Sequence, residues 1–167
     1  MATMNKITSN LWFDSQAEEA ANFYVSVFKN AGIGRITKFS DEGFEIHKRP
    51  AGSTMTVEFF LEGQSFLALN GGPIFKFNEA ISFIIYCETQ EEIDYYWEKL
   101  TEGGDENARQ CGWLKDKFGL SWQVVPVILD DMFIDAESEN AKRAMRAMLG
   151  MKKLNFAELQ KAYEGKE

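Results

Sequence analysis

An internal repeat limits the folds open to this chain more than any other feature of its sequence. The segment FDSQAEEAANFY, from Phe13 to Tyr24, matches CETQEEIDYYW, from Cys87 to Trp97, with one residue skipped. The copies lie 74 residues apart at the start (14 to 88) and 73 residues apart at the end (24 to 97). Self-similarity at a long period indicates a structural unit that occurs twice. We therefore expect two similar modules, each about half of the core.

Both halves show the same order of predicted elements. In the first half, apolar patterning and turn residues predict a helix over 16–29 and strands at 6–13, 35–40, 55–61 and 65–69, with Gly63 and Gln64 in a hairpin turn. Asp14 or Ser15 is expected to accept hydrogen bonds from the first amides of that helix. The second half predicts a helix over 90–100 and strands at 81–87, 109–114 and 120–125. The order in the first half is βαβββ, and the second half is expected to repeat it in an α+β fold. That repetition implies eight strands in two sets of four, of which the seven ranges above are located.

The length of 167 residues fits a single domain. Its expected parts are a first module, a second module and a C-terminal helical extension, at 5–70, 79–127 and 128–167. Within the extension, helices are predicted over 139–149 and 156–163, the second opened by Asn155 and Glu158 in the form of a capping box. Met145, Met148 and Met151 recur every three residues there, which indicates packing in the core or a partner surface.

Charge narrows the range of partners. The chain has 26 acidic and 18 basic residues, a formal charge of −8. That charge repels phosphate backbones and anionic lipid, and no basic patch offsets it, so neither nucleic acid nor a membrane is an expected partner. The first residues lack the apolar run of a secretory signal, and no stretch approaches the roughly 20 apolar residues of a membrane span. We expect a cytoplasmic protein with reduced cysteines.

Few residues are suited to catalysis. His47 is the single histidine, so a site with two histidine ligands cannot form within one chain. The two cysteines, Cys87 and Cys111, are not in a CxxC pair, which excludes a zinc cluster of that kind or a thioredoxin-like redox pair. Cys87 ends a strand expected to be buried, and Cys111 is the more exposed of the two. No GxGxxG or GxxxxGK[ST] sequence stands between a strand and a helix, so there is no nucleotide-binding motif.

Alternation along two predicted strands gathers polar side chains on one surface. In LSWQVVP, Ser121, Gln123 and Val125 face one way and Trp122 and Val124 the other. In AISFIIYCE, the same alternation puts Ser82, Ile84 and Tyr86 on one face. Buried Gln and Ser side chains need hydrogen-bond partners, so this pattern indicates a polar ligand pocket or an internal hydrogen-bond network.

Three long segments resemble a known family. The strings WFDSQAEEAANFY, NGGPIFKFNEAISFIIYC and QCGWLKDKFGLSWQVVP are similar to the PhnB-like family of the vicinal oxygen chelate superfamily, which includes glyoxalase and bleomycin-resistance proteins. The resemblance covers residues 5 to 165. It implies two βαβββ modules in a curved, eight-stranded half-barrel and a homodimer. Proteins with these strings often carry the label 3-demethylubiquinone-9 3-methyltransferase.

The resemblance also indicates where a site would lie. Metal ligands in the superfamily come from the first and fourth strands of each module, and those positions hold Ser9 or Asn10, Ala68 or Asn70, Ser82, and Gln123. Neutral side chains of this kind are poor ligands for a catalytic divalent ion, so no metal or other cofactor is expected. A metal-free pocket is expected instead, with candidate residues Asn10, Trp12, Asn70, Ser82, Phe83, Cys111, Trp113 and Gln123.

The expected function is the binding of a small polar or aromatic metabolite in that pocket. Whether the ligand is transformed is left open. One alternative is an enzyme, either a metal-dependent isomerase, lyase or dioxygenase with ligands shared between subunits, or the quinone methyltransferase of the label. The chain has no glycine-rich loop and acidic ribose partner for S-adenosylmethionine. The other alternative is a structural or interaction protein that uses its C-terminal helices.

Overall fold

The computed structural model describes residues 5–166. These residues form two compact units, 5–77 and 78–166. The first unit contains β1 (Ser9–Phe13), α1 (Ala17–Val27), β2 (Ala31–Lys38), α2 (Phe44–His47), β3 (Thr54–Leu61) and β4 (Gln64–Asn70). The second contains β5 (Phe83–Cys87), α3 (Gln90–Thr101), the 3-10 helix η1 (Glu106–Ala108), β6 (Trp113–Lys115), β7 (Ser121–Pro126), α4 (Leu129–Met132), α5 (Glu139–Leu149) and α6 (Phe156–Glu164).

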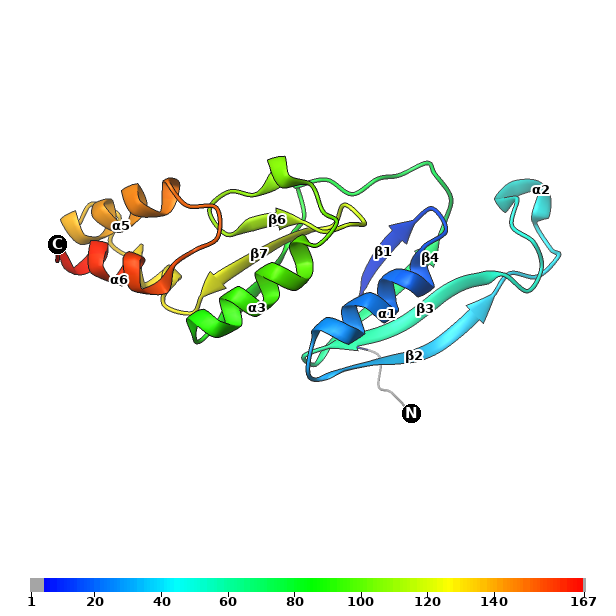
Figure 1. Cartoon of the computed structure of the whole chain (residues 1–167). Helices are drawn as coiled ribbons and strands as arrows, with labels where there is room; N and C mark the ends of the chain where they lie inside the picture. The colour runs from blue at the N-terminus through cyan, green and yellow to red at the C-terminus, as the bar shows by residue number, and fades with distance from the viewer. Residues whose placement is uncertain (1–4, 167) are drawn as a thin grey trace. The chain divides into compact units, whose positions relative to one another are not determined.

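The first unit is a four-stranded sheet with one face covered by α1 (Figure 1). Its strand order is β1-β4-β3-β2, with β1 parallel to β4 and the other neighbours antiparallel. Side chains on the covered face are buried and pack as a row of aromatic rings: Tyr24 of α1 stacks on Phe59, which stacks on Phe66. This apolar layer makes βαβββ the stable arrangement for the first half, as its alternation predicted.

Asn70 at the end of β4 holds the start of α1. Its carboxamide oxygen accepts a hydrogen bond from the Ala17 N–H at 2.8 Å, and its amide nitrogen donates to the Thr54 carbonyl at 2.9 Å. The N-cap residue, Gln16, makes no side-chain capping bond. The expectation of a cap from Asp14 or Ser15 is therefore wrong, because a residue from a distant strand occupies that role.

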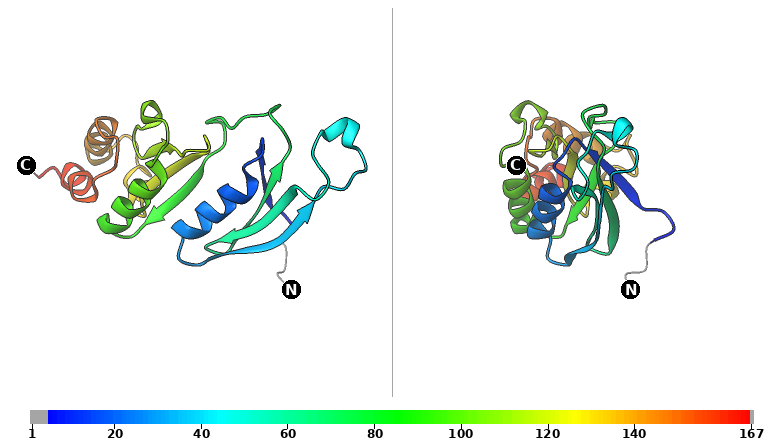
Figure 2. Two further views of the ribbon diagram at one scale, coloured as in Figure 1. Left: turned by 45° about the vertical axis from the view of Figure 1, so that its right-hand side comes forward. Right: turned by 90° about the vertical axis from the view of Figure 1, so that its right-hand side faces the viewer.

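The second unit has a three-stranded sheet in the order β5-β7-β6, with β5 parallel to β7. Helix α3 packs against this sheet, as the left-hand view of Figure 2 shows. The α+β fold class is confirmed, but the strands of residues 5–166 form sheets of four and three rather than the eight strands expected. Residues 102–112 leave no room for the eighth strand, because they hold a glycine turn, η1 and an isolated bridge from Gln110 to Trp113.

The C-terminal helices pack onto the end of β7. Their shared core consists of Val125, Leu129, Met132, Ala144, Leu154 and Leu159, and Met148 and Met151 pack against it. Met145 is 38% exposed, so the methionine series divides between core and surface. The predicted Asn155 cap of α6 is confirmed, since its side chain accepts a hydrogen bond from the Glu158 N–H. Within residues 5–166, no helix combines the length and the hydropathy needed to cross a membrane.

We predict that Asn70→Ala destabilises the protein by about 2 kcal/mol, because it removes both hydrogen bonds of a buried amide. Equilibrium urea unfolding measures the change. Asn10→Ala is the matched control, since Asn10 is exposed on β1 and should change the free energy of unfolding by less than about 0.5 kcal/mol. Equal losses in the two variants would contradict the role given to Asn70.

Candidate ligand-binding site

The second sheet has one face covered by α3 and one open face. Trp122 and Val124 of β7 are buried on the covered face, together with Ile93 and Leu100 of α3. Gln123 lies between them in sequence and is only partly buried, because alternate residues of a strand face opposite ways. The predicted alternation along β7 is confirmed, and it places Gln123 on the open face.

Gln123 is the centre of a small polar group on that face. Its amide nitrogen donates to the Ser82 hydroxyl at 2.9 Å. Ile84 of β5 and Trp113 of β6 are its neighbours across the sheet. Within residues 5–166 the Gln123 carbonyl oxygen accepts no hydrogen bond, so that atom can accept one from a ligand. The structure therefore brings together Ser82, Trp113 and Gln123 of the predicted set.

Two further polar residues point to the same side of the sheet as Gln123 by alternation, one of them buried and one half-exposed. Ser121 is fully buried, and its hydroxyl has no partner among the described residues, which is unusual for a buried polar group. Tyr86 is half-exposed, and its hydroxyl donates to Asp130 at 2.9 Å. The hydrogen bond to the Asp130 carboxylate raises the pKa of Tyr86 above its ordinary value. This face thus offers hydrogen-bond donors and acceptors that are neutral. Lys115 of β6 is the charged strand residue on it.

A buried carboxylate fixes the strand that carries Gln123. Asp116 is 2% exposed and lies in the turn between β6 and β7. Its carboxylate accepts hydrogen bonds from the Phe118 and Leu120 N–H groups at 2.9 and 3.1 Å, and from Trp122 Nε1 at 2.9 Å. Because these bonds hold the turn and the Trp122 indole together, they set which face of β7 is open.

The open face of the first sheet carries a different set of side chains. On this face Asn10 is exposed and Trp12 is partly buried. The alternate residues of β1, Leu11 and Phe13, are buried and face α1. The Trp12 indole donates to the Gly72 carbonyl at 2.9 Å and meets the Phe75 ring edge-on at 4.9 Å. Trp12 is therefore anchored within its own unit, and Asn10 is the freer of the two.

An ion pair on this face was not among the predicted site residues. Arg35 of β2 and Glu58 of β3 approach to 2.7 Å, and this hydrogen-bonded pair lowers the pKa of Glu58. The alternation of TMTVEFFL, which puts Val57 and Phe59 under α1, leaves Glu58 on the opposite face. The alternation of side chains along β3 was thus the sequence signal that could have located the Glu58 carboxylate on this face.

Comparison with known proteins identifies the family. The family model described as 3-demethylubiquinone-9 3-methyltransferase matches residues 5–125. The chain belongs to this family, here termed PhnB-like. The match ends short of the residue 165 expected from the resemblance, so α4, α5 and α6 lie outside the family model.

Solved structures agree with this assignment. A PhnB protein from Bacillus cereus, titled as a 3-demethylubiquinone-9 3-methyltransferase, is 35% identical, with 73% of this chain and 99% of that chain covered and a TM-score of 0.63. Protein PA1353 from Pseudomonas aeruginosa is 18% identical over 74% of this chain and 98% of that chain, with a TM-score of 0.57, and shows a likeness of fold. No curated protein matches the chain.

The superfamily's metal-ligand positions do not form a metal site in this PhnB-like chain. Ala68 and Asn70 of β4 are buried on the α1 side, and the residues of β4 on the open face are Leu67 and Leu69. Ser82 and Gln123 are neutral and bonded to each other. Among residues 5–166 there is no group of three His, Cys, Asp or Glu side chains that could hold an ion. The donor set does not fit a catalytic divalent metal.

Three predicted pocket residues do not belong to the Ser82–Gln123 group. Asn70 is bound to α1, as described above, and lies on the covered face of its sheet. Phe83 points to the α3 side, where its ring packs against Trp122 at 5.6 Å. Cys111 precedes β6, and its thiol donates to the Met148 carbonyl of α5 at 3.4 Å. Alternation explains the first two, because each is one residue out of phase with the open face.

Cys87, the other cysteine, is fully buried at the end of β5. Burial, with the nearby Glu92 charge, raises the pKa of its thiol to about 12. The thiol stays protonated at neutral pH and is a poor nucleophile. Cys87 therefore acts as a small apolar residue of the core.

We predict that Asp116→Asn destabilises the protein by about 2 kcal/mol, because an amide nitrogen cannot accept the hydrogen bonds that one carboxylate oxygen now takes. Thermal unfolding followed by Trp fluorescence measures this. Asp131→Asn, at an exposed position of α4, makes the same chemical change and should leave stability within about 0.5 kcal/mol of the parent. A stable Asp116→Asn variant would show that the turn does not depend on the carboxylate.

Proposed function

We propose that this PhnB-like protein binds a small, neutral or weakly polar aromatic metabolite on the open face of its second sheet, without a metal ion. The single observation that carries the proposal is the Ser82–Gln123 pair, whose donor and acceptor groups stand between apolar neighbours. Few polar groups placed on an apolar surface are typical of small-molecule sites, because the apolar contacts supply affinity and the polar groups fix orientation.

Each neighbour of the pair has a role in this proposal. Trp113 and Ile84 flank Gln123 on β6 and β5 and offer the flat apolar surface against which a ring packs. The Gln123 carbonyl oxygen accepts a hydrogen bond from a ligand hydroxyl or amine.

The test is a thermal-shift titration of metal-stripped protein with a panel of phenols, hydroquinones and substituted benzoates. A ligand that binds the native state alone raises Tm as its concentration rises. We expect a shift that Gln123→Ala reduces by weakening the affinity about fivefold to tenfold, the effect of losing one hydrogen bond of about 1 kcal/mol or slightly more. Gln160→Ala on α6 is the control and should bind as the parent does.

Two results would contradict this function. The first is a shift that Gln123→Ala leaves unchanged. The second is an increase in Tm that requires an added divalent ion, since the proposal excludes a metal from the site. Circular dichroism of each variant establishes that folding is intact before the titrations are compared.

A second candidate is methyl transfer, which the family description names. The family match is the observation in its favour. The same titration with S-adenosylmethionine separates the two functions, and we predict no change in Tm, because the chain has no glycine-rich loop between a strand and a helix for the adenosine and methionine parts. A concentration-dependent rise in Tm would favour the methyltransferase.

The homodimer and the cytoplasmic location stay predictions from the sequence.

A further inference from the structure

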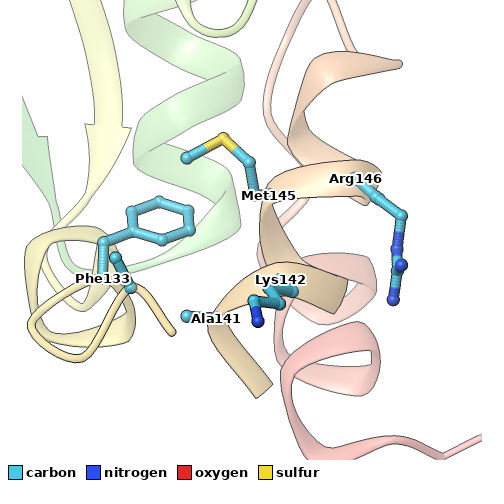
Figure 3. Close-up of a pocket in the computed structure, with 6 residues that line it drawn as sticks. Phe133, Ala141, Lys142, Met145 and Arg146 are labelled. Carbon is cyan, nitrogen blue, oxygen red and sulfur yellow. The ribbon is translucent and has the colours of Figure 1, made fainter. Parts of the chain in front are cut away.

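A hollow of about 310 Å³ opens beside α5, in the part of the chain beyond the family model. It is lined by Phe133, Ala136, Ala141, Lys142, Met145 and Arg146. Figure 3 shows the Met145 side chain reaching from α5 toward the Phe133 ring, with Lys142 and Arg146 on the same helix. None of the residues around Gln123 lines this hollow, so it is a second candidate site.

The walls of the hollow are held in place by contacts of their own. Phe133 packs against the core of the C-terminal helices. Ala141 is 2% exposed, which fixes this side of α5 on the core. Ser138 caps the helix: its hydroxyl accepts from the Ala141 N–H at 3.1 Å and donates to the Asp135 carbonyl at 2.8 Å. The hollow is therefore formed before any ligand binds, which lowers the entropic cost of binding.

Charge on the rim is positive, in a chain of formal charge −8. Lys142 and Arg146 are four residues apart on α5, and both line the hollow. Lys142 is 3.2 Å from Glu137 and 3.8 Å from Glu139, whose side chains are 91% and 72% exposed. Ion pairs this exposed are weak, so another carboxylate can replace them. Arg146 has no hydrogen-bond or ion-pair partner within residues 5–166.

We propose that the hollow binds a small monocarboxylate with an apolar chain, its carboxylate at Lys142 and Arg146 and its chain between Met145 and Phe133. At about 30 Å³ for each water-sized group, the volume accommodates on the order of ten non-hydrogen atoms. The cations disfavour a neutral or cationic amphipath, and the apolar lining disfavours an inorganic anion. A monocarboxylate with an apolar chain suits both the cationic and the apolar side chains of the lining.

The test uses the full-length protein labelled with 13C at its methionine methyl groups and octanoate, which matches this size, below its micellar concentration. Met145 lines the hollow whereas Met148 and Met151 pack against the core, so the Met145 signal, assigned with Met145→Leu, should shift saturably and the other two should shift little. Ala136→Leu fills the hollow from its exposed side and should abolish the shift.

Two charge variants test the recognition of the carboxylate. The double variant Lys142→Gln/Arg146→Gln should raise the Kd for octanoate about tenfold, since an exposed ion pair contributes up to about fivefold. Binding of octan-1-ol should stay weak and unchanged in this variant. Lys152→Gln removes an exposed positive charge outside the hollow and should change the Kd for octanoate less than about twofold.

Several outcomes would overturn the proposal. These are a Met145 signal that does not move, octan-1-ol binding equal to octanoate in the parent, and equal weakening by Lys152→Gln and the double variant. Gln123→Ala should bind octanoate as the parent does, so this result is independent of the function proposed for the second sheet. Unchanged Tm values for the variants establish that loss of binding is not loss of folding.

Discussion

The candidate site on the second sheet depends on one buried carboxylate. Asp116 gathers two backbone N–H groups and the Trp122 indole around a single turn. A charged group with 2% exposure is stable only when such donors surround it. Because Trp122 and Gln123 are adjacent, fixing the indole toward α3 fixes the carboxamide toward the open face. The polar group with Ser82 follows from a hydrogen-bond arrangement that lies outside the site.

The two halves of the repeat have diverged in chemistry while keeping their order of elements. On the open face of the first sheet, Leu67 and Leu69 stand on β4, and the Arg35–Glu58 ion pair spans β2 and β3. On the second sheet, the strand corresponding to β4 is β7, and it carries Gln123. Strand order and helix cover are shared because both halves need to bury the same kind of apolar layer. Side chains on the open faces need not be apolar, and they differ between the two halves.

Periodic apolar patterns made the fold predictable from the sequence, whereas interactions between distant residues did not. The α3, α5 and α6 helices, the alternation of β7 and the Asn155 cap all depend on neighbours within a few residues, and these predictions agree with the structure. The roles of Asn70 and Asp116 are set by a distant helix and by a folded turn, which no local pattern shows. The predicted pocket residues Asn70 and Phe83 lie on the helix-covered faces of their sheets, and a shift of one residue along a strand reverses the direction of a side chain.

The source of the α1 cap also has a consequence for the order of folding. The hydrogen bond from the Ala17 N–H to Asn70 joins residues separated by 53 positions, whereas α3 is capped locally, by the Thr89 side chain accepting from the Glu92 N–H. Helix α3 can complete its first turn from adjacent residues. Helix α1 gains the corresponding bond after β4 has come alongside β1, and a contact of such sequence separation is slow to form because its loop must close first. In this duplicated architecture, α3 is therefore equipped to complete its first turn before α1 does.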